Sequence, residues 1–69
     1  MTNRILLHLY GSHQACNNAY ILLENQPQIK RIDIQDDTKT LFIFPNKQLT
    51  EKTLIPLLYE SGISGFRIE

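Results

Sequence analysis

The chain opens with an alternating pattern that is typical of a β-strand. Between residues 5 and 10, one set of alternate side chains is aliphatic and the other is mixed: Ile5, Leu7 and Leu9 alternate with Leu6, His8 and Tyr10. A period of two places the two sets on opposite faces of a strand. Because Gly11 ends the pattern, we expect a short first strand with its aliphatic face in a core.

The pattern then changes to a helical period. Ser12 is a candidate N-cap, and Pro27 marks the end of the segment, because the residue before a proline disfavours helical geometry. Between them, small and aliphatic residues recur at helical spacing: Ala15, Ala19, Leu22 and Leu23. One amphipathic helix is therefore predicted here.

Two further strands are predicted in the middle of the chain. The first begins just after Pro27 and contains Ile29, Ile32 and Ile34. The segment Asp36-Asp37-Thr38 is typical of a polar turn. The apolar run Leu41–Phe44 then predicts a strand that Pro45-Asn46 closes.

A second helix is predicted around Leu54, Leu57 and Leu58, and its start has two alternatives. With Thr50 as N-cap, Glu51 suits the positive end of the helix dipole, but Pro56 removes a hydrogen bond inside the helix. With Thr53 as N-cap, Pro56 falls in the first turn at little cost. Gly62 is the expected C-cap, and the alternation of Phe66 and Ile68 predicts a last strand.

These elements predict an α+β fold in one domain spanning residues 1–69. The order strand, helix, strand, strand, helix, strand is the ferredoxin-like βαββαβ plan: a two-layer sandwich with a four-stranded antiparallel sheet and both helices on one face. The side chains expected between the layers are Ile5, Leu7, Leu9, Ala19, Leu23, Ile32, Ile34, Leu41, Ile43, Leu54, Leu58 and Phe66.

Composition narrows the function classes. Seven basic and seven acidic residues in 69 give no basic stripe for a nucleic-acid backbone. No apolar run is long enough to insert into a membrane. A single cysteine excludes an internal disulfide and agrees with a reducing cytoplasm. No nucleophile with its base and no working carboxylate pair is visible, so an enzyme is not expected.

Two segments of the chain match the pattern of a known family. The end of the first helix and the second strand read Leu23-Glu24-Asn25-Gln26-Pro27-Gln28-Ile29-Lys30-Arg31-Ile32-Asp33-Ile34, close to the pattern Leu-x-x-x-Pro-Gly-Val-x-x-Val-x-Val. The second half matches more specifically, through Phe44-Pro45 and the spacing of Leu54, Leu58, Gly62 and Ile63. In these segments the chain resembles the heavy-metal-associated domain family, the type found in copper chaperones and at the N-terminus of metal-transporting ATPases.

The departure from the family lies at its metal motif, Cys-x-x-Cys at the start of the first helix. Here the loop reads Gly11-Ser12-His13-Gln14-Ala15-Cys16-Asn17. Pairing His13 with Cys16 keeps the family's two-residue gap and gives an open site of imidazole and thiolate, ligands that suit Zn(II) or Cu(I). Alignment from Gly11 instead puts Gln14 and Asn17 at the ligand positions, and alignment back from Pro27 puts Ser12 and Ala15 there. In a further alternative, Cys16 is a packing residue and His13 a solvated one.

The open face of the sheet is a second candidate site. Alternation and the expected central pairing of the first and third strands place an apolar and aromatic patch there: Leu6, His8, Tyr10, Phe42 and Phe44. Exposed patches of this kind mark interfaces. The alternative is that long polar side chains such as Arg31 and Lys39 cover it.

Two functions follow as expectations. The first is a cytoplasmic domain that carries a soft transition-metal ion, Cu(I) or Zn(II), through Cys16 and His13. Its partner would be a metal-transporting protein or a second copy of the chain, which would form a homodimer. The second is a degenerate domain of the same fold that binds no metal and acts as an interaction or dimerisation module through the open face.

Overall fold

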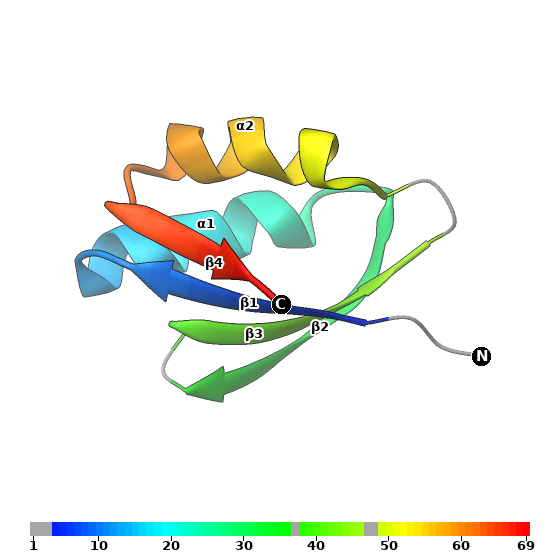
Figure 1. Cartoon of the computed structure of the whole chain (residues 1–69), viewed down its shortest axis with the longest axis horizontal. Coiled ribbons are helices and arrows are strands. Elements are labelled where there is room, and N and C mark those ends of the chain that lie inside the picture. Colours follow the sequence, from blue (N-terminus) through cyan, green and yellow to red (C-terminus); the bar gives the residue numbers. More distant parts are fainter. Residues whose placement is uncertain (1–3, 37, 47–48) are drawn as a thin grey trace.

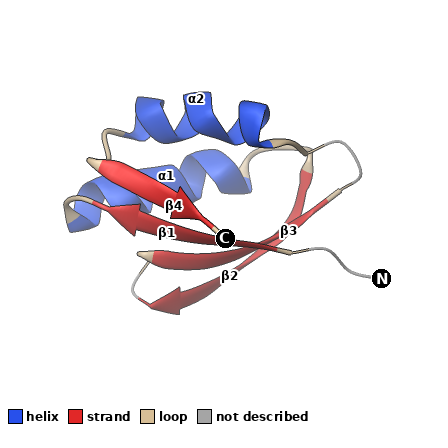
Figure 2. Ribbon diagram, in the orientation of Figure 1, coloured by secondary structure: helices blue, strands red, loops and turns tan. Residues whose placement is uncertain are grey.

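The predicted order of elements is confirmed in the computed structural model, which describes residues 4–36, 38–46 and 49–69. Its elements are β1 (Ile5–Tyr10), α1 (His13–Glu24), β2 (Ile29–Asp36), β3 (Thr40–Pro45), α2 (Glu51–Ser61) and β4 (Gly65–Ile68). Figure 1 and Figure 2 show both helices on the same side of the sheet. The chain therefore has the ferredoxin-like two-layer sandwich that its hydrophobic pattern predicts.

The sheet has the strand order β2-β3-β1-β4, and all neighbouring strands are antiparallel. Leu6 lies opposite Phe42 and His8 opposite Thr40, so β1 and β3 form the central pair as expected. The start of β1 lies beside the end of β4, where Glu69 N donates to Leu6 O over 2.8 Å and Leu6 N donates to Glu69 O over 3.3 Å. The two outer strands are β2 and β4.

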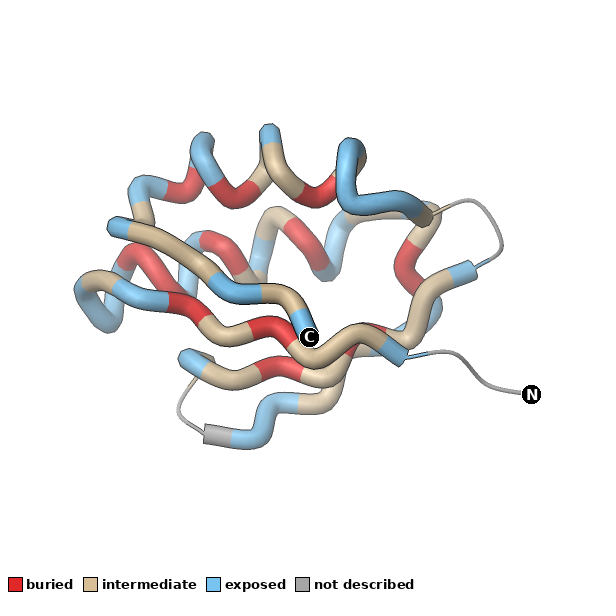
Figure 3. The backbone as a smooth tube through the Cα atoms, in the orientation of Figure 1, coloured by how far each residue is buried: buried red, intermediate tan, exposed pale blue. Residues whose placement is uncertain are grey.

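The core fills the space between the sheet and the helices (Figure 3). Eight of the twelve side chains expected there are buried: Leu7, Leu9, Ala19, Leu23, Leu41, Ile43, Leu54 and Leu58. Ile5, Ile32 and Phe66 are partly buried against this cluster.

Ile34 was expected between the layers; its orientation is confirmed, but the expected burial is wrong. It lies opposite the fully buried Leu41, so it points to the helix side, but 46% of its surface is exposed. Because β2 is an outer strand with a neighbour on one edge alone, this end of it extends past the cover that the core provides. A register shift between Ile34 and Asp36 makes the pairing of β2 with β3 irregular at this point, before it resumes at Asp36 and Thr40. Of the predicted turn 36–38, Asp36 is the last residue of β2, and Asp37 lies outside the described residues.

The helix ends resolve the capping alternatives. Ser12 caps α1 as predicted, because its side chain accepts a hydrogen bond from Ala15 N over 3.1 Å. The second helix begins after Thr50, whose carbonyl accepts from Leu54 N, so Pro56 lies inside α2. Gly62 ends α2 in the left-handed region, with φ 90°, as expected of a glycine C-cap.

The junction between β1 and α1 is tightly held against the start of β4. Ser64 N donates to Tyr10 O over 2.7 Å, which ties the segment after α2 to the end of β1. Gly11 has φ 143°, and a Cβ atom there would lie 3.0 Å from Ser64 N. A side chain at position 11 would therefore clash with backbone as well as strain its own. This contact fixes the point at which the chain enters α1.

Candidate functional site

The two predicted metal ligands occupy very different surroundings. His13 is the first residue of α1 and is exposed, whereas Cys16 is fully buried in the hydrophobic core. The phase of α1 explains the difference: its buried residues are Ala15, Cys16, Ala19 and Leu23, which recur at helical spacing on one side. The thiol of Cys16 is thus part of the packing between α1 and the sheet.

This burial bears directly on the choice among the alignments of the metal motif. A metal ion that arrives from solvent meets Gln14 and Asn17, which are exposed at the start of α1, and cannot contact the Cys16 sulfur unless that residue leaves the core. Within the described ranges, no three His, Cys, Asp or Glu side chains are grouped so that they could hold an ion. The pairing of His13 with Cys16 stays a prediction that requires a local rearrangement of α1.

The candidate interface residues come together on the open face of the sheet. The open face is the side of the sheet turned away from the helices. It carries Arg4, Leu6, His8 and Tyr10 before and along β1, Phe42 and Phe44 on β3, Arg31 and Asp33 on β2, and Arg67 and Glu69 along and after β4. Cross-strand pairing places Phe42 between Leu6 and Asp33. Leu6, His8, Phe42 and Phe44 are half-buried, and Tyr10 is 49% exposed.

Two arginines cover the aromatic rings of the open face. The Arg4 Cζ atom lies 4.5 Å from the centre of the Phe42 ring, and the Arg31 Cζ atom lies 4.3 Å from the centre of the Phe44 ring. Both distances are within the range of a cation–π interaction. The alternative that long polar side chains cover the patch holds for Arg31 at Phe44. Arg4 does the same at Phe42; its alternation with Leu6 and His8 was the signal in the sequence that could have identified it.

A polar network lies at the other end of the open face. Glu69 Oε2 is hydrogen-bonded to His8 Nε2 over 2.5 Å and accepts from the Arg67 guanidinium over 3.0 Å. The hydrogen bond from His8, followed by the positive charge of Arg67, holds the pKa of the Glu69 carboxyl below its ordinary value. This network is absent from the sequence prediction because it needs the pairing of β1 with β4, which brings His8 opposite Arg67.

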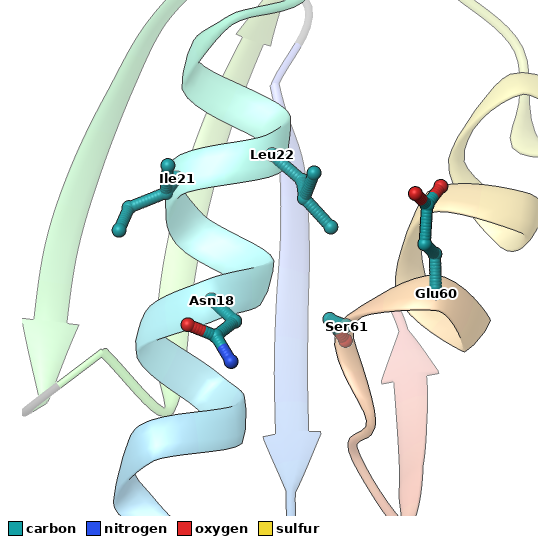
Figure 4. Close-up of a pocket in the computed structure, with 5 residues that line it drawn as sticks. All are labelled: Asn18, Ile21, Leu22, Glu60 and Ser61. Atoms are coloured by element: carbon teal, nitrogen blue, oxygen red, sulfur yellow. The ribbon is translucent and has the colours of Figure 1, made fainter.

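An open groove runs between the two helices on the far side of the molecule from the open face. Figure 4 shows its lining residues: Asn18, Ile21 and Leu22 from α1, and Glu60 and Ser61 from α2. The buried Ser61 hydroxyl donates to Leu58 O over 2.5 Å, so it is already bonded within α2. The groove holds one titratable group, Glu60, and offers no set of groups that could act on a substrate.

Comparison with solved structures finds the same fold in a copper transporter domain. Two solution structures of the yeast copper transporter domain Ccc2a, determined in the apo and Cu(I)-loaded states, are similar to the chain. The first has a TM-score of 0.75 and 17% sequence identity, and the match covers 100% of this chain and 96% of that chain. The second has a TM-score of 0.68 and 18% sequence identity, and the match covers 96% of this chain and 90% of that chain. At the level of fold, these likenesses confirm the resemblance that the sequence indicates. No protein-family model and no curated protein matches the chain.

Neither α1 nor α2, nor any other helix among the described residues, is long and apolar enough to cross a membrane.

Proposed function

We propose that this chain is a heavy-metal-associated-like domain that acts as a protein-interaction module through its open face. The observation that carries the proposal is the concentration of aromatic and arginine side chains on the one side of the sheet that no helix covers. Arginine and aromatic residues are enriched where proteins bind one another, because they combine large contact area with directed hydrogen bonds.

The burial of Cys16 supports the same proposal from a different side. A carrier must present its ligands to a partner so that the ion can be exchanged, and a thiol with 0% exposure does not do so. The open face needs no such rearrangement, because Tyr10 is already 49% exposed and the rings of Phe42 and Phe44 are only half-buried. The fold in which the similar copper transporter domain holds its ion would serve in this chain as a scaffold for binding a protein partner.

Site-specific photocrosslinking in the cells that produce the protein tests this function. The photoreactive amino acid benzoylphenylalanine replaces Tyr10 on the open face, and in a matched control it replaces Tyr59 of α2, which is 73% exposed. A discrete crosslinked product is expected from position 10 and not from position 59. It should disappear when Phe42→Glu is added, while circular dichroism shows that the fold is retained.

The same experiment can contradict the proposal in two ways. Equal products from positions 10 and 59 would indicate random contact, and no product from position 10 would indicate that the open face is not an interface. Sedimentation of the purified chain separates self-association from binding to a different protein. A monomer whose behaviour is unchanged by Phe42→Glu excludes the homodimer.

A second candidate function is a carrier of Cu(I) or Zn(II) that delivers its ion to a metal-transporting protein in the cytoplasm. The observation that favours it is the structural likeness to a domain solved in a Cu(I)-loaded state. In this function Cys16 is the thiolate ligand and His13 the second ligand. Both lie in the first turn of α1, three residues apart in the sequence.

Native mass spectrometry distinguishes the two functions. The chain is incubated with Zn(II), and separately with Cu(I) under reducing conditions. A carrier takes up one ion, loses it with Cys16→Ala and His13→Ala, and keeps it with the matched control His8→Ala. Uptake that persists after Cys16→Ala would contradict the carrier function.

A further inference from the structure

All three arginines of the chain lie on the open face. Arg31 faces Phe44 across the β2–β3 pair, Arg67 faces His8 across the β1–β4 pair, and Arg4 stacks on Phe42. The helix layer has an excess of negative charge. Helices α1 and α2 contain three glutamates and one lysine: Glu24, Glu51, Glu60 and Lys52. The two outer surfaces of the sandwich therefore differ in charge as well as in side-chain type.

The three guanidinium groups differ in whether a carboxylate of the chain is paired with them. Arg67 donates to Glu69 over 3.0 Å, and Arg31 Nε lies 3.3 Å from Asp33 Oδ1. Arg4 contacts the Phe42 ring, and among the described residues no carboxylate is paired with it. Stacking uses the flat face of a guanidinium and leaves its N–H groups in the plane of the group, where they can donate to a carboxylate in a bidentate arrangement.

We propose that the open face binds an acidic segment of another protein, with a carboxylate on Arg4 and an apolar side chain against Leu6 and Phe42. This inference rests on the proposed function and names the chemistry of its partner. The stacked arginines are held in place by the rings before binding, so less side-chain entropy is lost when a carboxylate arrives.

The charges on the open face favour an acidic protein segment over two other occupants, a single-stranded nucleic acid and a second copy of the chain. A single-stranded nucleic acid needs a run of uncommitted cations along its backbone, whereas Asp33 and Glu69 already neutralise two of the three arginines. A second copy placed face to face sets arginines against arginines. A second copy that offers its acidic helices instead makes a head-to-tail contact that does not close. An acidic segment needs one uncommitted guanidinium, and it meets Arg4 with one carboxylate.

Fluorescence anisotropy tests the inference directly. The probe is a labelled peptide in which glutamates alternate with serine and leucine, and the matched probe carries glutamine in place of each glutamate. The acidic peptide is expected to bind and the glutamine peptide to bind at least about ten-fold more weakly. Arg4→Gln is expected to weaken binding of the acidic peptide about five-fold, and Arg4→Lys by less. Arg31→Gln is expected to weaken it less than Arg4→Gln, because the Arg31 guanidinium is already paired with Asp33. The control Lys52→Gln, on α2, removes the same charge and leaves affinity unchanged.

Three outcomes would overturn the inference: no binding of the acidic peptide, binding by Arg4→Gln as tight as by the wild type, or tighter binding of a labelled single-stranded RNA. Urea titration of each variant shows that it is folded, and Arg4→Lys keeps the experiment informative if Arg4→Gln is not. A crosslink at position 10 together with failure of the acidic peptide would refute the partner chemistry and leave the interaction module standing. Failure of both would refute both.

Discussion

Cys16 shows how the phase of a helix decides the chemistry of a residue. A thiol at the start of a helix is activated by the helix dipole when it faces solvent, and it is inert when it is packed in a core. Because α1 begins at His13, position 16 falls on the stripe that also contains Ala19 and Leu23. A shift of one residue in the helix start would have rotated the sulfur by about 100°, toward the surface.

Thiol labelling measures the burial of Cys16. With a reagent such as dithionitrobenzoate, we expect the folded chain to react at least about a hundred-fold more slowly than the chain unfolded in guanidinium, because the sulfur must first be exposed by local opening. Cys16→Ala should lower the free energy of unfolding by about 1 kcal/mol, the order expected for loss of one buried heavy atom. Labelling as fast in the folded chain as in the unfolded one would contradict the buried thiol and favour the carrier function.

The Glu69 carboxyl gives a residue-scale prediction for pH. Its pKa is held below the ordinary value of 4.5 by His8 and then by Arg67. A carboxyl with a lowered pKa in the folded state stabilises the fold above 4.5, and this contribution is lost as the pH falls through the folded value. In urea titrations from neutral to acid pH, the wild-type midpoint should therefore fall more steeply below 4.5 than that of Glu69→Gln. The effect is small because the group is exposed. Parallel curves for the two proteins would show that the network does not contribute.

At the scale of the element, α2 contains a proline in its interior, whereas α1 contains none. Pro56 has no N–H group to donate to the carbonyl of Lys52, one turn earlier, yet α2 continues from Glu51 to Ser61. Leu54 and Leu58, on either side of the proline, are fully buried. The packing of these two leucines supplies the free energy that keeps the helix intact across the missing hydrogen bond.

Pro56→Ala is expected to raise the free energy of unfolding by about 1–2 kcal/mol, because the gain of a helical hydrogen bond outweighs the added freedom of the unfolded chain. The matched control is Pro27→Ala. Pro27 lies outside both helices, in the turn that precedes β2, so its replacement restores no helical bond. Chemical denaturation of the two variants beside the wild type measures the difference. A stability gain from Pro27→Ala as large as that from Pro56→Ala would contradict this account.

The helices and strands were predictable because the hydrophobic period that defines each one can be read from neighbouring residues. The burial of a single residue was not, because it depends on which distant parts of the chain pack over it. Alternation predicted that Ile34 and Leu41 point to the same side, and they do, but it could not show that the outer strand β2 extends past the core at Ile34. For Cys16, the spacing to Ala19 and Leu23 was a signal of burial that the resemblance to a metal motif outweighed. The Glu69 network depended on strand pairing, which no local pattern records.

At the scale of the molecule, the two faces of the sheet have different roles: the face packed against the helices stabilises the fold, and the open face is the proposed binding surface. Fully buried side chains lie between the sheet and the helices, and the open face contains none among the described residues. In a chain of 69 residues the core is small, so each large side chain in it carries a substantial part of the total stability. Substitutions on the two sides of the sheet should therefore have separable effects on folding and on binding.

The pair Leu41 and Ile34 tests how that stability is distributed. They face each other across β2 and β3, yet Leu41 is fully buried and Ile34 is 46% exposed. Leu41→Ala is expected to cost about 3 kcal/mol, enough to unfold a large fraction of the chain, and Ile34→Ala less than about 1 kcal/mol. Thermal unfolding followed by circular dichroism gives both values. Similar losses from the two substitutions would show that Ile34 is packed as deeply as Leu41.

The backbone hydrogen bonds between Leu6 and Glu69 also have a topological consequence. Since the start of β1 and the end of β4 are neighbours in the sheet, a short linker can join them, and the chain can instead be opened in the turn between β2 and β3. Such a circular permutant retains every strand neighbour of the original. The domain could equally be inserted as a unit into a surface loop of another protein, entering and leaving at adjacent points.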